Sequence, residues 1–402
     1  MTHLCLERAD AIPLAVDITV PDVDGDEAFL NALLPHVPRI GSLRLTGHSS
    51  IETVTDELIG FFASPMLELT SLELQQTEEP TQLFPPDDAP VPQPFRNVSK
   101  LKSLALTQTP LYPALFTIGS LVELKLTGYT IPLQFGTLLE LLDSNRGLEL
   151  VVLDVQFVTG SVETTLARRV HLARLHHLSI TCTGPVDARG LLSSISLPHN
   201  TSLEVPRSEV VPLDSYLPSP PTPIHMVLAP ITVVKYQTSP RELHVSGGHG
   251  GFSFRSFQSV PLLPELYLFP TASVREFHLD TSPWAIIPAY FIPVLRQLPV
   301  LETLVAANIT WATGTLASLA VQPLPCPSLK TMAFFNCELT PEAIREFEGA
   351  IVKRKDSEAA RLYRVIIVSS TGVLPDYALV QGLRRHVPYV DARMDDKLPD
   401  LS

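Results

Sequence analysis

The chain has 402 residues, of which 45% are hydrophobic and 18% are charged, and its formal net charge is −13. This length allows a large buried core, in one long domain or in two ordinary ones. The hydrophobic fraction excludes a disordered chain, and the acidic balance argues against nucleic-acid binding, which needs clustered Lys and Arg. Four scattered cysteines without a C-x-x-C pair exclude a disulfide scaffold and predict neither a zinc site nor a redox pair.

No segment has the pattern of a signal peptide or of a membrane span. The first 20 residues carry Glu7, Arg8 and Asp10 where a signal peptide would be apolar. The most apolar segment, 284–305, is interrupted by prolines and an arginine. We therefore expect a cytoplasmic or nuclear protein that does not enter a membrane.

A short apolar motif, Leu-x-x-Leu-x-Leu, recurs along the chain. Clear copies begin at Ile40, Leu69, Leu101, Leu121, Leu150 and Leu175, and after a gap at Val274, Leu301 and Leu329; weaker copies lie at Leu243/Val245 and from Leu362. Neighbouring clear copies are 20 to 32 residues apart, close to the leucine-rich-repeat period of about 20–29 residues. The copy LKTMAFFNC, 329–337, also has a cysteine at the Asn/Cys position of that pattern.

Each clear copy predicts a short strand whose second and third apolar side chains point into a core, because side chains alternate along a strand. The predicted strands are 43–45, 72–74, 104–106, 124–126, 153–155, 178–180, 277–279, 304–306 and 332–334. One such strand cannot bury its apolar side alone, so neighbouring copies must stack. The sequence therefore predicts an α/β fold, a curved leucine-rich-repeat solenoid with a parallel concave sheet and irregular convex helices.

The spacers between the strands contain four predicted helices, at 26–34, 136–142, 340–354 and 376–386. The third has Thr340 as its N-cap and Pro341 in its first turn. The Pro-rich insertion at 85–94 predicts an extended surface loop. The one at 206–240 predicts either a linker or a distortion of the solenoid. Residues 242–257 alternate around a Gly-rich turn and predict a hairpin. We favour a single domain over 1–402; two half-solenoids joined near residue 215 are the alternative.

Four stretches resemble the fungal, mainly basidiomycete, F-box/leucine-rich-repeat protein family: 6–20 (LERADAIPLAVDITV), 34–47 (LPHVPRIGSLRLTG), 294–308 (VLRQLPVLETLVAAN) and 386–396 (HVPYVDARMDD). The resemblance covers most of the chain. In that family an N-terminal F-box module recruits a ubiquitin-ligase adaptor, and the repeats hold the target. The resemblance thus implies a substrate-recognition module. No Leu-Pro-x-Glu-type F-box segment precedes the repeats, so we expect that this chain alone does not bind the adaptor.

No motif of an enzyme is present: there is no G-x-S-x-G elbow, no Walker loop and no H-E-x-x-H. The segment SGGHGG, 246–251, lacks the spacing of a phosphate-binding loop and predicts a hairpin turn. His176 and His177 are adjacent, so on a strand they point to opposite faces and cannot chelate a metal from one side. We expect no enzymatic activity, no cofactor and no metal.

The repeat phase also predicts which side chains point outward on the concave face, where a protein partner could bind. The polar positions are Arg44, Thr46, Glu73, Gln75, Lys125, Thr127, Asp154, Gln156, Thr181, His244, His278 and Asp280. The apolar positions are Val305, Ala307, Ala333, Phe335, Ile366 and Val368. An exposed apolar set would mark an interface anchored on Phe335. The alternative is that the final segment, 387–400, covers it, or that the last strands are buried on both faces.

Two functions remain open at this point. The first is a protein-binding solenoid of the substrate-receptor kind. The second is a leucine-rich regulatory domain of another system, of GTPase-activating or immune type. A GTPase-activating role would need a reaching arginine, and by the repeat phase Arg44 is the only arginine expected at a concave strand position.

Overall fold

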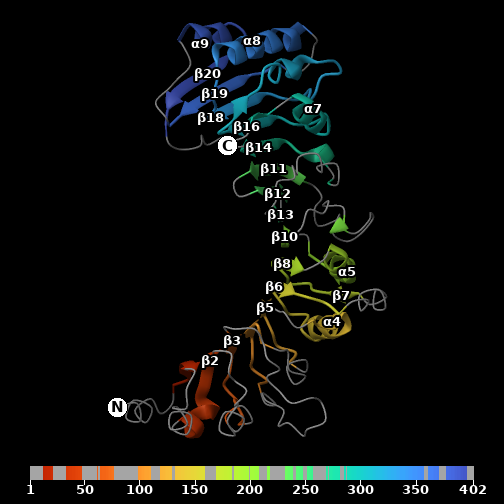
Figure 1. Cartoon of the computed structure of the whole chain (residues 1–402), viewed down its shortest axis with the longest axis vertical. Helices are drawn as coiled ribbons and strands as arrows, with labels where there is room; N and C mark the ends of the chain where they lie inside the picture. The colour runs from red at the N-terminus through yellow and green to blue at the C-terminus, as the bar shows by residue number, and fades with distance from the viewer. Residues whose placement is uncertain are drawn as a thin grey trace. The chain divides into compact units, whose positions relative to one another are not determined.

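The computed structural model describes residues 12–20, 33–47, 61, 64–76, 98–109, 118–128, 132–158, 169–182, 185–198, 200–207, 215–217, 231–238, 241–247, 251–256, 269, 271–280, 285–286, 288–356, 361–370 and 377–395 (Figure 1). The described residues up to Thr201, with 215–217, form one compact unit, and the others form a second. Both units are α/β, with a long sheet of short, mainly parallel strands and few helices. The interpretation of 1–402 as one continuous domain stays a prediction.

The sheet of the first unit is parallel and follows the order of the chain. Its described strands are β1 (Leu14–Val20), β2 (Ile40–Gly47), β3 (Ser71–Gln76), β4 (Ser103–Thr107), β5 (Glu123–Thr127), β6 (Leu150–Val155) and β8 (His177–Cys182). All six strands predicted in this part of the chain are confirmed. The sequence analysis missed β1, where Val16 and Ile18 stand opposite Leu43 and Leu45.

The register between strands aligns the repeated motif. One row of inward side chains is Leu43, Leu72, Leu104, Leu124, Val151 and Leu178, and the next is Leu45, Leu74, Leu106, Leu126, Leu153 and Ile180. All of them are buried. We call this side of each sheet the inner face and the opposite side the outer face.

The register corrects one predicted copy of the motif. Opposite Leu124 stands Val151, not Leu153, so the copy in β6 begins at Leu148 and not at Leu150. Leu148 is fully buried, whereas Leu150 lies on the outer face and is only partly buried. The steps from 121 to 148 and from 148 to 175 then both become 27 residues. The apolar run LELVVLDV fits two phases, and only strand pairing distinguishes them.

The turn that follows a strand repeats in both units. Gln108, Gly128, Asn308 and Asn336 each stand seven residues after the first apolar residue of their copies, and each has a positive φ between 48° and 64°. The N–H groups of Gln108, Asn308 and Asn336 donate to a carbonyl at or next to the end of the neighbouring strand, at 2.8–2.9 Å. Glycine and asparagine suit this left-handed conformation best.

The side chain of the residue after this turn contacts backbone carbonyls near the end of its own strand and of the preceding strand. Thr109 Oγ1 donates to Leu74 O at 3.4 Å and to Thr107 O at 3.0 Å. Cys337 Sγ makes the equivalent contacts, to Ala306 O at 3.2 Å and to Phe335 O at 3.6 Å. Cys337 is the cysteine that the sequence places at the Asn/Cys position of the repeat.

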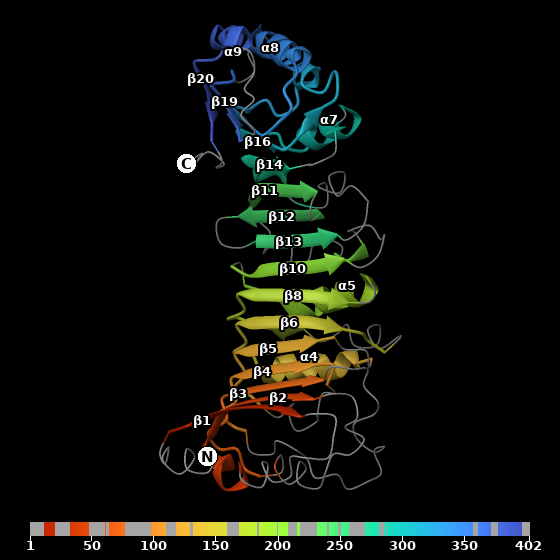
Figure 2. The same ribbon diagram turned by 60° about the vertical axis from the view of Figure 1, so that its left-hand side comes forward.

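Helices cover the inner face of the first unit. The helical elements are η1 (Leu34–Arg39), α4 (Phe135–Ser144) and α5 (Pro185–Ser194), and a short parallel pair joins β7 (Val170–His171) to β9 (Ile195–Ser196). Figure 2 shows α4 behind the strands of the sheet. The prediction of a helix at 136–142 is confirmed by α4, whereas α5, which contains Gly190 and several serines, was missed. Residues 26–32 and 85–94 lie outside the described residues.

The sheet of the second unit mixes both strand directions. Its order is β10 (Ser202–Arg207), β13 (Gly251–Ser256), β12 (Arg241–Gly247), β11 (Ile231–Thr238), β14 (Glu276–Asp280), β16 (Thr303–Ala307), β18 (Thr331–Phe335), β19 (Arg364–Ser369) and β20 (Tyr389–Met394). β12 runs antiparallel to both its neighbours, and the other pairs are parallel.

The predictions for the second unit met different outcomes. The predicted strands at 277–279, 304–306 and 332–334 are confirmed by β14, β16 and β18. β12 and β13 pair antiparallel where the sequence predicts a hairpin. The Pro-rich stretch 206–240 is not a linker throughout, because β11 occupies its last part. The sequence analysis predicted neither β11 nor β20.

The core of the second unit contains a chain of aromatic rings. Its helical elements are η6 (Thr271–Ser273), α7 (Pro288–Arg296), η7 (Ala317–Ala320), α8 (Pro341–Asp356) and α9 (Tyr377–Arg384), and β15 (Ala285–Ile286) pairs with β17 (Thr310–Trp311). Phe291, Trp311, Phe334 and Phe347 pack edge to face, with centroids 5.3–5.9 Å apart. They join α7, β17, β18 and α8.

The sequence anticipates two of these helices, α8 and α9. In α8 the predicted N-cap is present, because the Ala343 N–H donates to Thr340 Oγ1 at 3.1 Å. The prediction at 376–386 is confirmed by α9, and α7 was missed. Among the helices that the structure describes, none has the length and apolar character needed to cross a membrane.

Near the end of α8, Arg354 points into the protein and is 2% exposed. Its guanidinium donates to Leu319 O at 3.0 Å, to Pro325 O at 3.1 Å and to Cys326 O at 2.9 Å. It therefore ties the loop from 319 to 326 to the helix.

Candidate interaction surface

The outer face of β2–β8 in the first unit is polar. We call it the outer polar face, and it consists of Arg44, Thr46, Glu73, Gln75, Ala105, Thr107, Lys125, Thr127, Val152, Asp154, Ser179 and Thr181, with Gln156 just beyond β6. The residues predicted for this unit lie on it with the exception of Gln156, which follows β6 and has no register partner in the described strands. The structure adds Ala105, Thr107, Val152 and Ser179, which the same alternation could have given from the sequence. Neighbouring strands of a sheet lie about 4.8 Å apart, so these side chains are evenly spaced.

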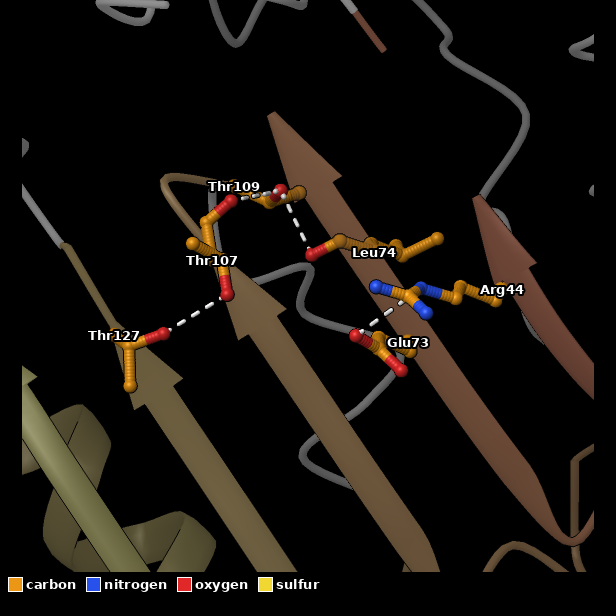
Figure 3. A network of polar contacts seen from close by, with 6 residues as sticks. All are labelled: Arg44, Glu73, Leu74, Thr107, Thr109 and Thr127. Carbon is orange, nitrogen blue, oxygen red and sulfur yellow. Dashed lines mark hydrogen bonds and ion pairs between the residues drawn. The ribbon is translucent and has the colours of Figure 1, made fainter. Parts of the chain in front are cut away.

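Charges of opposite sign face each other across the first strands. Asp17, Arg44 and Glu73 stand in register on β1, β2 and β3. Arg44 Nε lies 3.4 Å from Glu73 Oε1, and their side chains are 49% and 42% exposed (Figure 3). An ion pair this exposed contributes only about 0–1 kcal/mol, so either partner can change its contacts at little cost.

Lys125 belongs to a second polar group on the same face. Lys125 Nζ lies 3.9 Å from Glu123 Oε2 on its own strand. Ser103 Oγ on β4 donates to the same Glu123 oxygen at 3.2 Å. These contacts are also partly exposed and weak, so Lys125 is available to a partner.

Hydroxyl groups form a row along the ends of the strands. Thr46, Gln75, Thr107 and Thr127 stand in register, and the Oγ1 atoms of Thr107 and Thr127 are 2.8 Å apart (Figure 3). β-Branched side chains have few rotamers, so the three threonines of this row are preordered, whereas Gln75 is not restricted in this way.

Asp154 extends the row of strand-end groups with a carboxylate. One of its oxygens, Oδ2, accepts the Gly128 N–H at 3.2 Å. Thr181 stands opposite Asp154 on β8, and the Gln156 carbonyl accepts the Leu133 N–H at 2.7 Å. The end of the row is therefore fixed by backbone contacts.

His244, His278 and Asp280 belong to the second unit and lie on its outer face. Lys235 on β11 stands in register between the two histidines. His278 Nε2 contacts the carboxylate of Glu276, and Asp280 Oδ2 accepts from Asn308 Nδ2 at 3.2 Å. The sequence analysis missed Lys235 because β11 was not predicted.

Of the two interpretations of the apolar outward positions near the C-terminus, the exposed surface is contradicted and burial on both faces is confirmed. Val305, Ala333, Ile366 and Val368 form a cluster in which no residue is more than 1% exposed, and Phe335 packs against it. Ala307 is also buried. β16, β18 and β19 are therefore buried on both faces, as the alternative interpretation expected. Their outer residues are valine, alanine and isoleucine, which suit a covered strand as well as an exposed patch.

The register also corrects the expectation that Arg44 is the only outward arginine. Arg364 on β19 and Arg393 on β20 also lie on the outer face of the second unit, opposite Tyr389 and Val368 respectively. Both were missed, Arg393 because β20 was not predicted. Arg44 itself is held by Glu73.

No catalytic chemistry is indicated at the described cysteines. Burial raises the pKa of both the Cys326 and the Cys337 thiols from 9.0 to about 12. At neutral pH both are thus protonated and poor nucleophiles. Within the described ranges no group of three or more His, Cys, Asp or Glu residues could hold a metal ion.

Comparison of the sequence with known family models and with curated proteins finds no match. The fold itself defines the class of protein: an α/β protein built on long, mainly parallel sheets of short, repeat-like strands.

Proposed function

We propose that this chain is a protein-binding module of the leucine-rich-repeat type, a curved solenoid whose concave side is the outer face of the sheets. Three features support the repeat assignment: the aligned leucine rows, the left-handed residue after the strand, and the strand-end contacts of Thr109 and Cys337. The resemblance to F-box/leucine-rich-repeat proteins favours the substrate-recognition part of a ubiquitin-ligase receptor.

The observation that carries the proposal is the outer polar face. It offers evenly spaced hydroxyl, amide, carboxylate and cationic groups on a rigid parallel sheet. Small molecules usually bind in concave, mainly apolar pockets, whereas protein interfaces of the non-obligate kind have a polar rim and mixed charges. The face therefore suits a protein partner.

The weak ion pairs on this face are the groups that a partner would recruit. Arg44, Glu73 and Lys125 are each about half exposed, and each is paired at 3.4–3.9 Å. A partner with the opposite pattern of charges would replace these contacts with shorter, less solvated ones, which raises the association rate and fixes orientation.

The test is a combined charge reversal, Arg44→Glu, Glu73→Arg and Lys125→Glu. Proteins captured from a cell lysate by the unaltered chain are identified, purified and measured for direct binding. We expect affinity to fall at least about tenfold in the triple variant. The control is Arg146→Glu, which disrupts an exposed ion pair with Asp143 at the end of α4 (2.8 Å) and not on the outer face. Equal binding by the triple variant and the control would refute the proposed surface.

The second function, a GTPase-activating or immune-type regulatory domain, gains no support from the described residues. Arg44 would have to extend into a nucleotide site. Its guanidinium lies against Glu73 in an exposed ion pair, and no nucleotide site is identified beside it among the described residues.

A further inference from the structure

The strand β20 ends the described sheet of the second unit (Figure 2). In the described part of the chain its only paired neighbour is β19. Four of its side chains are exposed: Asp391, Arg393, Tyr389 at 57% and Met394 at 62%. An edge strand carries a row of N–H and C=O groups that can pair with another strand.

The hydrogen bonds show which residues direct their backbone groups to the open edge. The Tyr389 N–H donates to Tyr363 O at 3.2 Å, and the Asp395 N–H donates to Ser369 O at 3.3 Å. The odd-numbered residues therefore point toward β19. Because successive residues of a strand alternate, Val390, Ala392 and Met394 point away from it.

Among the described residues, the side-chain contact to a backbone group of this edge is long. Arg384 Nη2 of α9 lies 3.5 Å from Val390 O, in an exposed position. This confirms that the Val390 carbonyl points outward. A contact at that distance is weak and is easily exchanged for a backbone hydrogen bond.

The residues of β20 are self-complementary about Ala392. Val390, Asp391, Ala392, Arg393 and Met394 read apolar, acidic, small, basic, apolar. In an antiparallel pair of two such strands centred on Ala392, each Asp391 stands opposite Arg393 of the second copy. Each Val390 stands opposite Met394 of the second copy.

We propose that this edge pairs with the same edge of a second copy of the chain, antiparallel and centred on Ala392, to form a symmetric homodimer. The proposal does not depend on the proposed function. The symmetry makes the interface isologous, as in most homodimers.

The hydrogen-bond geometry agrees with this register. Val390, Ala392 and Met394 are the residues whose N–H and C=O groups face the edge, so they form the hydrogen-bonded pairs. Asp391 and Arg393 then form non-hydrogen-bonded pairs, in which side chains approach most closely. Centring the pair on Asp391 or on Arg393 would instead place like charges opposite each other.

Both faces of the joined sheet would also match. Val390 and Ala392 stand in register with the buried Val365 and Ile367, so the apolar pairs would continue the inner face. On the outer face, the Arg393 guanidinium lies 3.7 Å from Asp391 Oδ2 and 3.8 Å from Oδ2 of Asp395, just after β20, and both contacts are long. The cross-strand ion pairs would replace the contact with Asp391.

The test uses the full chain in sedimentation velocity over a range of concentrations. The paired strands are short, so we expect a reversible dimer with a dissociation constant of roughly 10–500 μM. Ala392→Pro removes an N–H that faces the edge and leaves pairing with β19 intact. It should raise the dissociation constant at least about tenfold.

Charge variants give a test that does not rely on proline. Asp391→Arg alone and Arg393→Asp alone each place like charges opposite each other, so each protein should be monomeric. Mixing the two proteins should restore a heterodimer, because one then supplies two cations and the other two anions. Glu342→Arg, which disrupts an exposed ion pair with Arg345 on α8, serves as the control and should dimerise normally.

Two results would overturn the proposal. One is a monomer at every concentration up to about 500 μM. The other is a dimer that does not form through this edge. The edge variants would then dimerise like the unaltered chain, or the two charge variants would fail to form a heterodimer on mixing although their melting temperatures match that of the unaltered chain.

Discussion

Replacing Leu124 by alanine tests the assignment of the inner face of the first unit. Leu124 lies in the middle of β5, is 0% exposed, and stands between Leu104 on β4 and Val151 on β6. If the repeated motif places its leucines in the core, this change must create a cavity.

The size of the loss follows from the surroundings of Leu124. Leucine to alanine removes three carbons, which corresponds to about 2.4 kcal/mol at about 0.8 kcal/mol per buried CH₂. A cavity term is added because neighbours collapse only in part, and measured losses reach about 5 kcal/mol. Leu104 and Val151 are both held by sheet hydrogen bonds, so little collapse is expected. We expect a loss of about 4 kcal/mol in the free energy of unfolding.

The assay is urea-induced unfolding followed by far-UV circular dichroism. Both tryptophans, Trp284 and Trp311, come after residue 201, so tryptophan fluorescence would not report on the first unit. The matched control is Lys125→Ala, the next residue on β5, whose exposed side chain points to the outer face. It should change stability by less than about 0.5 kcal/mol. A loss below about 1 kcal/mol for Leu124→Ala, or similar losses for both variants, would refute the assignment.

Two further outcomes are expected in the second unit. Arg354→Lys should lower the free energy of unfolding by about 3 kcal/mol in urea titrations, because an ammonium cannot reach all three carbonyls that the guanidinium binds. A loss under about 1 kcal/mol would contradict this expectation. Alkaline pH should destabilise the fold through Cys326, whose pKa is about 12 when folded and 9.0 ordinarily. The thiol ionises first in the unfolded chain, so its contribution is complete below pH 9 and is lost as the pH rises toward 12, on the order of 1 kcal/mol being lost by pH 10. Cys326→Ala should flatten the decline of melting temperature between pH 8 and 10, and an unchanged slope would show that Cys326 is not responsible.

The strands with a full motif could be predicted from the sequence, because their leucines recur with the spacing of a strand that buries one side. β1 could not, since Pro13 stands where the motif would have its first leucine and only Val16 and Ile18 remain. In β6 the motif fits two phases, and pairing with β5 selects the one that begins at Leu148. Register is a property of two strands together, so one strand does not reveal it.

The candidate surface shows a similar limit. Alternation along a strand gives the outward direction of Arg44, Glu73 and Lys125, and the structure places all three on the outer polar face. Alternation does not show whether an outward side chain meets water. Val305 and Ile366 point outward and are nevertheless buried. Their burial depends on segments distant in sequence, which no local pattern describes.

The ninth position of the repeat shows why a regular fold need not leave a regular sequence. In two copies a side-chain donor at this position reaches the carbonyl of the previous strand, and both a hydroxyl and a thiol can supply it. Thr109 and Cys337 do so with the same two contacts. In the copy that begins at Leu301, the ninth residue is Ile309, which is buried and whose carbonyl accepts the Glu338 N–H at 2.9 Å. Three different residues thus stand at the same position of the repeat: two contact the previous strand through a side-chain donor, and the third is an apolar residue whose backbone carbonyl accepts a hydrogen bond.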